Sequence, residues 1–368
     1  MNKISIIGYG IVGKSILIQF ENRCDIQIND PLYDKSSSIE DISNSEFIFI
    51  CVPTPTNIET CCIDDTILSQ TLCKIKNTNA VVVIKSTITP DKLLSYKTLY
   101  PNMKLIMCPE FLIEKNYLHD AKYPKMIVIG GDKEHCEQLQ KLYELHSNCV
   151  STNYIITDLV SASLIKYMIN CFLTLKVSFM NQIFDIYEKS ESTISWDELV
   201  KAFSTDERIG KSHLNVPGPD GYRGWGGKCF YKDINAFIGY GKTLGLDLTL
   251  LKESIKYNEL VREEKDWLKI DGAITKPQMN KYILRFKRIK TEYNIYIVKI
   301  FINDEKIPLS ISWLEDKENE FLKGNKLNEI CDVIMFHIKE YEEEKHIKTN
   351  ITLEDIKQAY LNMEKSYE

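Results

Sequence analysis

A glycine-rich turn between a strand and a helix constrains the fold of this chain more than any other feature. Residues 3–7 read KISII and predict a strand, residues 8–13 read GYGIVG, and residues 14–20 predict a helix. In this order the glycines let a pyrophosphate approach the backbone at a helix N-terminus. The motif therefore predicts an α/β fold with a dinucleotide site.

The next strand supports this interpretation. Residues 26–29 predict a strand that ends at Asp30, about 20 residues beyond the glycines, where a carboxylate accepts from ribose hydroxyls and repels a 2′-phosphate. NAD is therefore favoured over NADP. Residues 8–15 also fit the phosphate loop of NTPases, G-x-x-x-x-G-K-[ST]. That alternative is weaker, because the strand at 47–52 ends in Pro-Thr-Pro-Thr and not in a Mg²⁺-binding aspartate.

Strands and helices continue to alternate along the first half of the chain. Predicted strands lie at residues 47–52, 80–85, 104–108 and 126–129, and predicted helices at residues 66–76 and 91–100. Such alternation predicts a parallel, doubly wound sheet that binds its ligand beyond the carboxyl ends of the strands. Glu110 and Glu114 follow one of these strands and are candidate acid/base groups, or solvated loop carboxylates.

A long helix is predicted for residues 157–189, which contain no Gly or Pro. Its apolar band is wider than one stripe and predicts that most of the helix is buried. The band comprises Leu164, Ile165, Met168, Ile169, Phe172 and Leu173. Lys166 and Asn170 are four residues apart on one face, and inside so apolar a helix they need partners or a wet cavity. They are candidates to stabilise a developing negative oxygen; alternatively, the lysine reaches the surface.

The stretch 224–233, GWGGKCFYKD, places a cysteine after three glycines. A helix is predicted for residues 234–244 with Gly245 as its stop, so Cys229 is expected at or just before a helix start. There the helix dipole and Lys232 favour the nucleophilic thiolate. The alternative is a buried structural cysteine.

Composition excludes several classes of function. A formal net charge of -6 argues against a nucleic-acid partner, and the N-terminus lacks the features of a signal peptide. The sequence contains no window of ~18 uninterrupted apolar residues, so no membrane span is expected. The 11 cysteines lack paired spacing, so free thiols in a reducing cytoplasm are expected, and no cluster has the spacing of a metal site.

These segments, taken in order, resemble the UDP-glucose/GDP-mannose dehydrogenase family over residues 1–262. The segments that carry the resemblance are residues 8–13, 52–56, 85–87, 109–112 with Glu114, Lys166 with Asn170, 206–210 and 226–233. The resemblance implies a four-electron oxidation of a sugar primary alcohol to a carboxylate with two NAD⁺. The substrate would be a nucleotide sugar, such as UDP-glucose or a UDP-N-acetylhexosamine, and the enzyme a cytoplasmic homodimer.

The resemblance also implies roles for individual residues. Cys229 would attack the intermediate aldehyde to give a thiohemiacetal, which a second hydride transfer converts to a thioester for hydrolysis. The other implied catalytic residues are Lys166 and Asn170 for the alkoxide and oxyanion, Asp233 for orienting a water or lysine, and Glu114 with Thr87 as the acid/base pair. The implied NAD-binding residues are Gly8, Gly10, Ile11, Val12, Gly13, Asp30, Lys35, Thr54, Thr56, Thr87, Glu114 and Lys232. The implied substrate-binding residues are Glu110, Phe111, Leu112, Glu114, Lys166, Asn170, Asn215 and Gly226.

The sequence departs from the family in two places. The segment 216–223 is longer than the family loop that covers the sugar, and no second Rossmann-like nucleotide domain follows residue 270. Strands at 282–286, 295–302 and 308–313 and helices at 327–341 and 353–366 instead predict a small α+β module. The predicted domains are therefore 1–153 (NAD-binding), 154–270 (central helical, for substrate and dimerisation) and 271–368 (role not indicated).

Two other functions remain open at this point. One is a degenerate family member that binds NAD or a sugar nucleotide and acts through its C-terminal module. The other is a hydroxyacid-type dehydrogenase that makes one hydride transfer with Lys166 as the acid, which leaves Cys229 without a role.

Overall fold

The computed structural model describes residues 1–150 and 152–275, the backbone of three strands in the tail, and positions 334–336, 338–339, 342, 351 and 356. Contacts divide the chain into two compact units, Met1–Thr275 and Lys276–Glu368. The predicted helices at 327–341 and 353–366 lie mostly outside the described residues, so they stay predictions.

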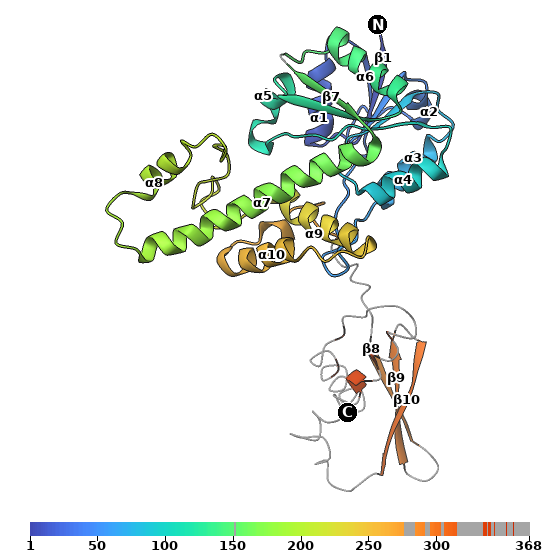
Figure 1. Cartoon of the computed structure of the whole chain (residues 1–368). Coiled ribbons are helices and arrows are strands. Elements are labelled where there is room, and N and C mark those ends of the chain that lie inside the picture. Colours follow the sequence, from blue (N-terminus) through green and yellow to red (C-terminus); the bar gives the residue numbers. More distant parts are fainter. Residues whose placement is uncertain are drawn as a thin grey trace. The chain divides into compact units, whose positions relative to one another are not determined.

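The first unit, coloured from blue to orange in Figure 1, contains a seven-stranded sheet in the order β2-β1-β3-β4-β5-β6-β7. The strands are β1 (Lys3–Ile7), β2 (Asp25–Asn29), β3 (Phe47–Ile50), β4 (Val81–Ile84), β5 (Lys104–Met107), β6 (Met126–Gly131) and β7 (Asn153–Thr157). Strands β1 to β5 are parallel, as predicted. The prediction of a wholly parallel sheet is wrong at one edge, because β6 is antiparallel to β5 and parallel to β7. The chain turns back after β5 without crossing the sheet, so the next strand runs in the opposite direction.

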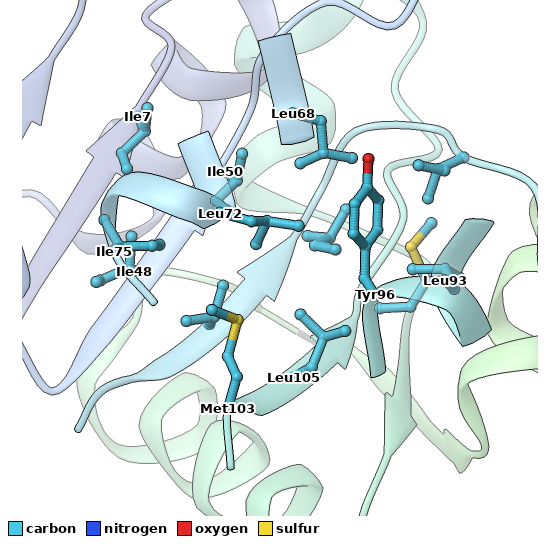
Figure 2. Close-up of a cluster of buried hydrophobic side chains, with 14 of the residues drawn as sticks. Ile7, Ile48, Ile50, Leu68, Leu72, Ile75, Leu93, Tyr96, Met103 and Leu105 are labelled. Atoms are coloured by element: carbon cyan, nitrogen blue, oxygen red, sulfur yellow. The ribbon is translucent and has the colours of Figure 1, made fainter. Parts of the chain in front are cut away.

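Helices cover both faces of the sheet. They are α1 (Ile11–Phe20), α2 (Ile39–Ser43), α3 (Thr66–Lys74), α4 (Pro90–Leu99), α5 (Tyr117–Lys122) and α6 (Lys133–His146), with the 3₁₀ turn η1 (Glu114–Asn116). Alternate strand residues enter opposite cores: Ile48 and Ile50 pack in the layer of α3 and α4 (Figure 2), and Phe49 in the layer of α1 and α6. The period-2 pattern thus builds three layers, with the carboxyl ends of β1 to β5 left at one edge.

The remaining helices of this unit are α7 (Leu159–Lys189), α8 (Trp196–Phe203), α9 (Gly227–Thr243) and α10 (Thr249–Val261), followed by the 3₁₀ turn η2 (Asp266–Leu268). Asp158 caps α7, because its carboxylate accepts from the Ser161 N–H at 2.9 Å. As predicted, α9 ends before a left-handed glycine, Gly245 (φ 73). Helix α7 contacts α4, α9, α10 and β6, and so joins the sheet to the other helices (Figure 1).

Only one side of α7 is buried, which corrects the expectation for its apolar band. Met168 and Phe172 are 61% and 63% exposed, whereas Lys166 and Asn170 on the packed side are buried. Within the described residues, α7 is the one helix with the length and apolar composition of a membrane span. Its buried polar side chains and its contacts with the neighbouring helices match the core helix of a globular unit.

The second unit contains a three-stranded antiparallel sheet in the order β10-β9-β8. Its strands are β8 (Leu284–Lys290), β9 (Ile295–Ile302) and β10 (Glu305–Leu314). Three strands were predicted here at nearly these positions. Strands that follow one another in the sequence are thus paired neighbours in this sheet.

Gly130 marks the tightest contact between α7 and the sheet. A Cβ at this position would lie 2.3 Å from the Asp158 carbonyl oxygen and 2.4 Å from the Ala162 Cβ. We therefore expect Gly130→Ala to lower the free energy of unfolding by roughly 2 kcal/mol or more, since either β6 or the first turn of α7 has to move. Urea unfolding would measure this, with Gly10→Ala as the matched control. A Cβ at Gly10 meets nothing within 4 Å, so equal losses in both variants would contradict the packing argument.

Candidate active site

The glycine turn after β1 has the shape that a dinucleotide pyrophosphate requires. Gly8 has φ +91, and a Cβ there would lie 2.7 Å from the Cys51 carbonyl oxygen; a Cβ on Gly13 would lie 2.0 Å from the Gly8 carbonyl oxygen. The first and third glycines are thus required by the turn and by helix–strand packing. Gly10 faces open space, which is where phosphate would approach the N-terminus of α1. This turn fits NAD.

The Asp30 carboxylate lies beside the same turn. Its Oδ2 accepts from the Tyr9 N–H at 2.6 Å and its Oδ1 from the Leu32 N–H at 2.8 Å. These bonds fix the carboxylate at the end of β2, the position from which an acidic side chain reaches ribose hydroxyls. The Tyr9 and Tyr33 rings contact each other in a tilted arrangement, with ring centroids 4.8 Å apart.

A buried ion pair joins α7 to the loop after β5. Lys166 Nζ lies 3.0 Å from the Glu110 carboxylate and donates to the Glu110 carbonyl oxygen at 2.7 Å, with both side chains nearly inaccessible to water. Burial opposes ionisation of Glu110, but Lys166 and the Leu112 N–H outweigh it, so the pKa of this carboxyl is lowered. Burial likewise opposes the charge on Lys166, yet Glu110, Asp233 and Cys229 raise its pKa. The pair is therefore an ammonium and a carboxylate.

A second polar contact links α7 to α9. Asn170 donates from Nδ2 to Asp233 Oδ2 at 2.5 Å, and Asp233 also forms an ion pair with Lys232. Both members of that ion pair are buried. Asp233 is thus held in one orientation: Lys232 balances its charge, and the Asn170 amide hydrogen-bonds to its other oxygen.

Cys229 lies in the first turn of α9, and its sulfur interacts electrostatically with Lys166, Asp233 and Glu110. The expectation that Cys229 is a thiolate is wrong, because the pKa of the thiol is raised to about 11. Solvent reaches the residue, yet the protein around it desolvates a thiolate, and the two carboxylates oppose the charge more than Lys166 and Lys232 favour it. Without ligand, Cys229 is a thiol at neutral pH.

Comparison with known proteins decides the family. The family model "UDP-glucose/GDP-mannose dehydrogenase family, NAD binding domain" matches residues 26–149, and the model of the "central domain" of the same family matches residues 160–260. A UDP-glucose 6-dehydrogenase of Rickettsia conorii is 30% identical over 80% of this chain and 70% of its own length. The chain belongs to the UDP-glucose/GDP-mannose dehydrogenase family. Its N-terminal sheet is an NAD-binding Rossmann domain.

Other members of the family are similar over the same part of the chain. A UDP-glucose 6-dehydrogenase of Rickettsia felis is 33% identical over 72% of this chain and 60% of its own length. The structure of a UDP-glucose dehydrogenase from Pyrobaculum islandicum superposes with a TM-score of 0.60 at 25% identity, over 71% of this chain and 68% of that one. The chain thus spans 60% and 53% of the lengths of two such relatives.

The structure gathers some of the substrate and catalytic residues that the family resemblance implied, but not all. Phe111 lies under Lys166, whose Nζ is 5.5 Å from the ring centroid. Glu114 is exposed at the start of η1, and no described contact joins it to Cys229 or Lys166. Asn215 is also exposed. Of the two candidate glutamates, the one that lies at the cysteine is Glu110.

The implied NAD residues likewise differ in accessibility. Thr54 donates from Oγ1 to the Thr87 carbonyl oxygen at 2.6 Å, which joins the loops after β3 and β4. Lys35 is exposed beyond β2, whereas Thr56 is fully buried and Lys232 is engaged by Asp233. The roles of these residues in holding NAD stay predictions.

No sequence pattern predicts the set of residues that holds the glycine turn before Cys229. Asn258 accepts from the Trp225 N–H at 2.7 Å, and Asp266 accepts from the Gly227 N–H at 3.0 Å. Arg262 packs against Gly226, where a Cβ would lie 2.2 Å from its Nη2. Asn258 belongs to α10, Arg262 is the C-cap of that helix and Asp266 begins η2, so all three lie about 30 residues or more beyond the turn, with no spacing that marks them.

The charges around Cys229 generate a prediction about its reactivity. Glu110→Gln removes a carboxylate that raises the pKa of the thiol and frees Lys166, so that pKa should fall. At pH 8 we expect alkylation of Cys229 by iodoacetamide to accelerate roughly 5-fold or more in the variant. Peptide mapping by mass spectrometry would follow it, with the exposed Cys62 and Cys73 as internal standards. An unchanged or slower rate at Cys229 would contradict this electrostatic account.

Proposed function

We propose that this chain oxidises the primary alcohol of a nucleotide sugar to a carboxylate in two NAD⁺-dependent steps, with Cys229 as the nucleophile. The observation that carries the proposal is the meeting of Cys229, Lys166, Glu110 and Asp233 in one cluster beside the Rossmann sheet. A cluster that only stabilised the fold would have no need for a thiol at its centre. Family membership and the names of the relatives support the same chemistry.

In the first oxidation, the buried ion pair handles the proton. Glu110 is ionised and accepts the hydroxyl proton of the substrate, while the Lys166 ammonium stabilises the alkoxide. Bound NAD⁺ supplies the hydride acceptor for both oxidations. The product of this step is an aldehyde that remains beside the sulfur.

In the second oxidation, the thiol of Cys229 adds across the carbonyl of the aldehyde: the sulfur bonds to the carbon and the thiol proton passes to the oxygen, which gives a thiohemiacetal. Lys166 and Asn170 stabilise the oxygen of this adduct, and Asp233 orients Asn170. Loss of hydride from the adduct, with release of the hydroxyl proton to solvent, leaves a thioester. After Glu110 has also released the alcohol proton to solvent, water activated by Glu110 cleaves the thioester to the carboxylate and the free thiol, which restores Cys229.

The substrate is proposed to be a UDP-sugar. The relatives from Rickettsia felis and Pyrobaculum islandicum are named for UDP-glucose, and the two segments that match the family include the residues of the cluster. The second unit, with its antiparallel β10-β9-β8 sheet, departs from the Rossmann-like nucleotide domain expected for the family.

This function predicts a fixed stoichiometry. With a panel of UDP- and GDP-sugars, at least one substrate should yield two NADH for each sugar consumed, measured at 340 nm together with the uronic acid formed. Cys229→Ser should lower the rate of uronic acid formation at least ~10³-fold, because the hemiacetal that serine would form with the aldehyde cannot give a thioester. The wild type and Cys229→Ser are both assayed as the folded full-length chain.

The outcome also separates the alternatives. One NADH per substrate, with activity that survives alkylation of Cys229, would favour a hydroxyacid-type dehydrogenase. No turnover with any nucleotide sugar, together with binding of NAD, would favour a degenerate member that acts through its tail. The retention of Lys166, Asn170, Cys229 and Asp233 in one cluster argues against that outcome.

We also propose that the chain works as a homodimer through α7, in a reducing, cytoplasmic compartment. The exposed side of α7 carries Met168, Phe172, Phe179 and Ile186, between 51% and 63% exposed, at helical spacing. An apolar stripe of this length on one helix face is typical of a subunit interface. The 10 cysteines that the structure describes are all free, as expected in a reducing compartment.

The dimer proposal predicts the effect of a charge on this face. Phe172→Glu should shift sedimentation velocity from dimer to monomer, because burial of an unpaired carboxylate at an interface is unfavourable. Leu99→Glu is a matched control at the end of α4, where the side chain is 62% exposed. A wild-type monomer, or equal effects of both variants, would contradict the assignment of α7.

A further inference from the structure

Arg262 lies between two segments that flank the candidate active site. Its guanidinium is 1% exposed and lies 2.7 Å from Asp220 and 3.3 Å from Asp266. It also donates to the Glu264 carbonyl oxygen at 2.8 Å and lies 5.3 Å from the centre of the Tyr222 ring. A buried cation that bridges two carboxylates is costly to desolvate, so its position is strongly determined by these partners.

One partner holds the turn that precedes the nucleophile. Asp266 accepts from the Gly227 N–H with both oxygens, at 3.1 and 3.0 Å, and Arg262 fills the space beside Gly226. These contacts fix the backbone at the N-terminus of α9. Because Cys229 lies in the same first turn, the contacts also fix the direction from which its sulfur faces Lys166.

The other partner belongs to the segment 216–223, which is longer than the family loop expected to cover the sugar. Asp220 lies in this segment, and the neighbouring Pro219 carbonyl oxygen accepts from Lys115 Nζ at 3.4 Å. Lys115 is in η1, in the loop that also carries Glu110. The long segment therefore reaches from the Cys229 turn to the Rossmann side of the cluster.

We propose that Arg262 is a positioning residue that couples the seating of the segment 216–223 to the placement of Cys229. Asp220 secures the segment to one part of the guanidinium, and Asp266 connects the other part to the Gly226–Gly227 backbone. Only the planar fork of arginine reaches both carboxylates at once. The part played in catalysis rests on the function proposed above, whereas the mechanical coupling does not.

The test uses iodoacetamide alkylation of Cys229 in the full-length chain at pH 8, without substrate. Arg262→Lys keeps the buried cation but loses the fork, and Asp220→Asn weakens the link on the side of the long segment alone. A loosened turn lets the sulfur move away from the carboxylates and into solvent, so iodoacetamide should alkylate Cys229 at least ~3-fold faster in each variant than in wild type. Rates at the exposed Cys62 and Cys73 should not change.

Asp247→Asn is the matched control, because Asp247 pairs with Lys252 on α10 without touching the turn or the long segment. It should leave the rate at Cys229 unchanged. Should Arg262→Lys fail to fold, Asp220→Asn alone decides, since its carboxylate is partly exposed. A rate at Cys229 within twofold of wild type in Asp220→Asn would overturn the coupling.

Turnover provides a second measurement. If the chain oxidises a nucleotide sugar, Asp220→Asn should lower kcat as well as raise KM, about 10-fold in kcat, since misplacement of a nucleophile slows the chemical step. A change in KM alone would mean that the segment binds substrate without placing Cys229, and would overturn the coupling. If no sugar is oxidised, the proposed function fails, while the alkylation rates still judge the coupling.

Discussion

The buried ion pair between Lys166 and Glu110 is the interaction on which the rest of the candidate site depends. It joins a long helix to the loop after β5, two segments that no backbone ladder connects. Neither charge is stable there alone, since removal of one partner from a buried pair costs roughly 3–5 kcal/mol. The pair therefore fixes how α7 crosses the carboxyl edge of the sheet. It also supplies, at one point, an acid and a base whose protonation states are set by each other.

The balance of charge around the sulfur follows from this arrangement. Lys166 and Lys232 are each paired with a carboxylate, so the stabilisation that they offer a thiolate is offset by the negative charge of their partners. The helix N-terminus contributes a favourable dipole, but desolvation and two nearby carboxylates outweigh it and raise the pKa of Cys229 to about 11. A protonated sulfur is the less easily oxidised form. The thiol that is proposed as the nucleophile is thus held in its protonated form.

Sequence patterns predicted the fold where a local rule determines the structure. The glycine turn, the apolar strands β1 to β5 and the extent of α7 were confirmed, because sterics and periodicity define them. The direction of β6 was not predictable, since strand direction depends on the path of a connection. Periodicity cannot distinguish an apolar stripe of α7 that is buried within the unit from one that is exposed on its surface. The choice between Glu110 and Glu114 needs the loop itself: the Leu112 N–H bonds to Glu110 Oε2 at 2.7 Å and helps to fix it beside Lys166.

The protonation states also bear on the order of the proposed steps. Abstraction of the alcohol proton needs an ionised base, and Glu110 is ionised in the resting site; addition to an aldehyde needs a sulfur that has lost its proton, and Cys229 still holds one. Once Glu110 has accepted the alcohol proton, one carboxylate that opposes the thiolate is neutral. The pKa of Cys229 then falls as the aldehyde forms beside it. The first oxidation would in this way activate the nucleophile for the second, and the thiol would become reactive when its target is present.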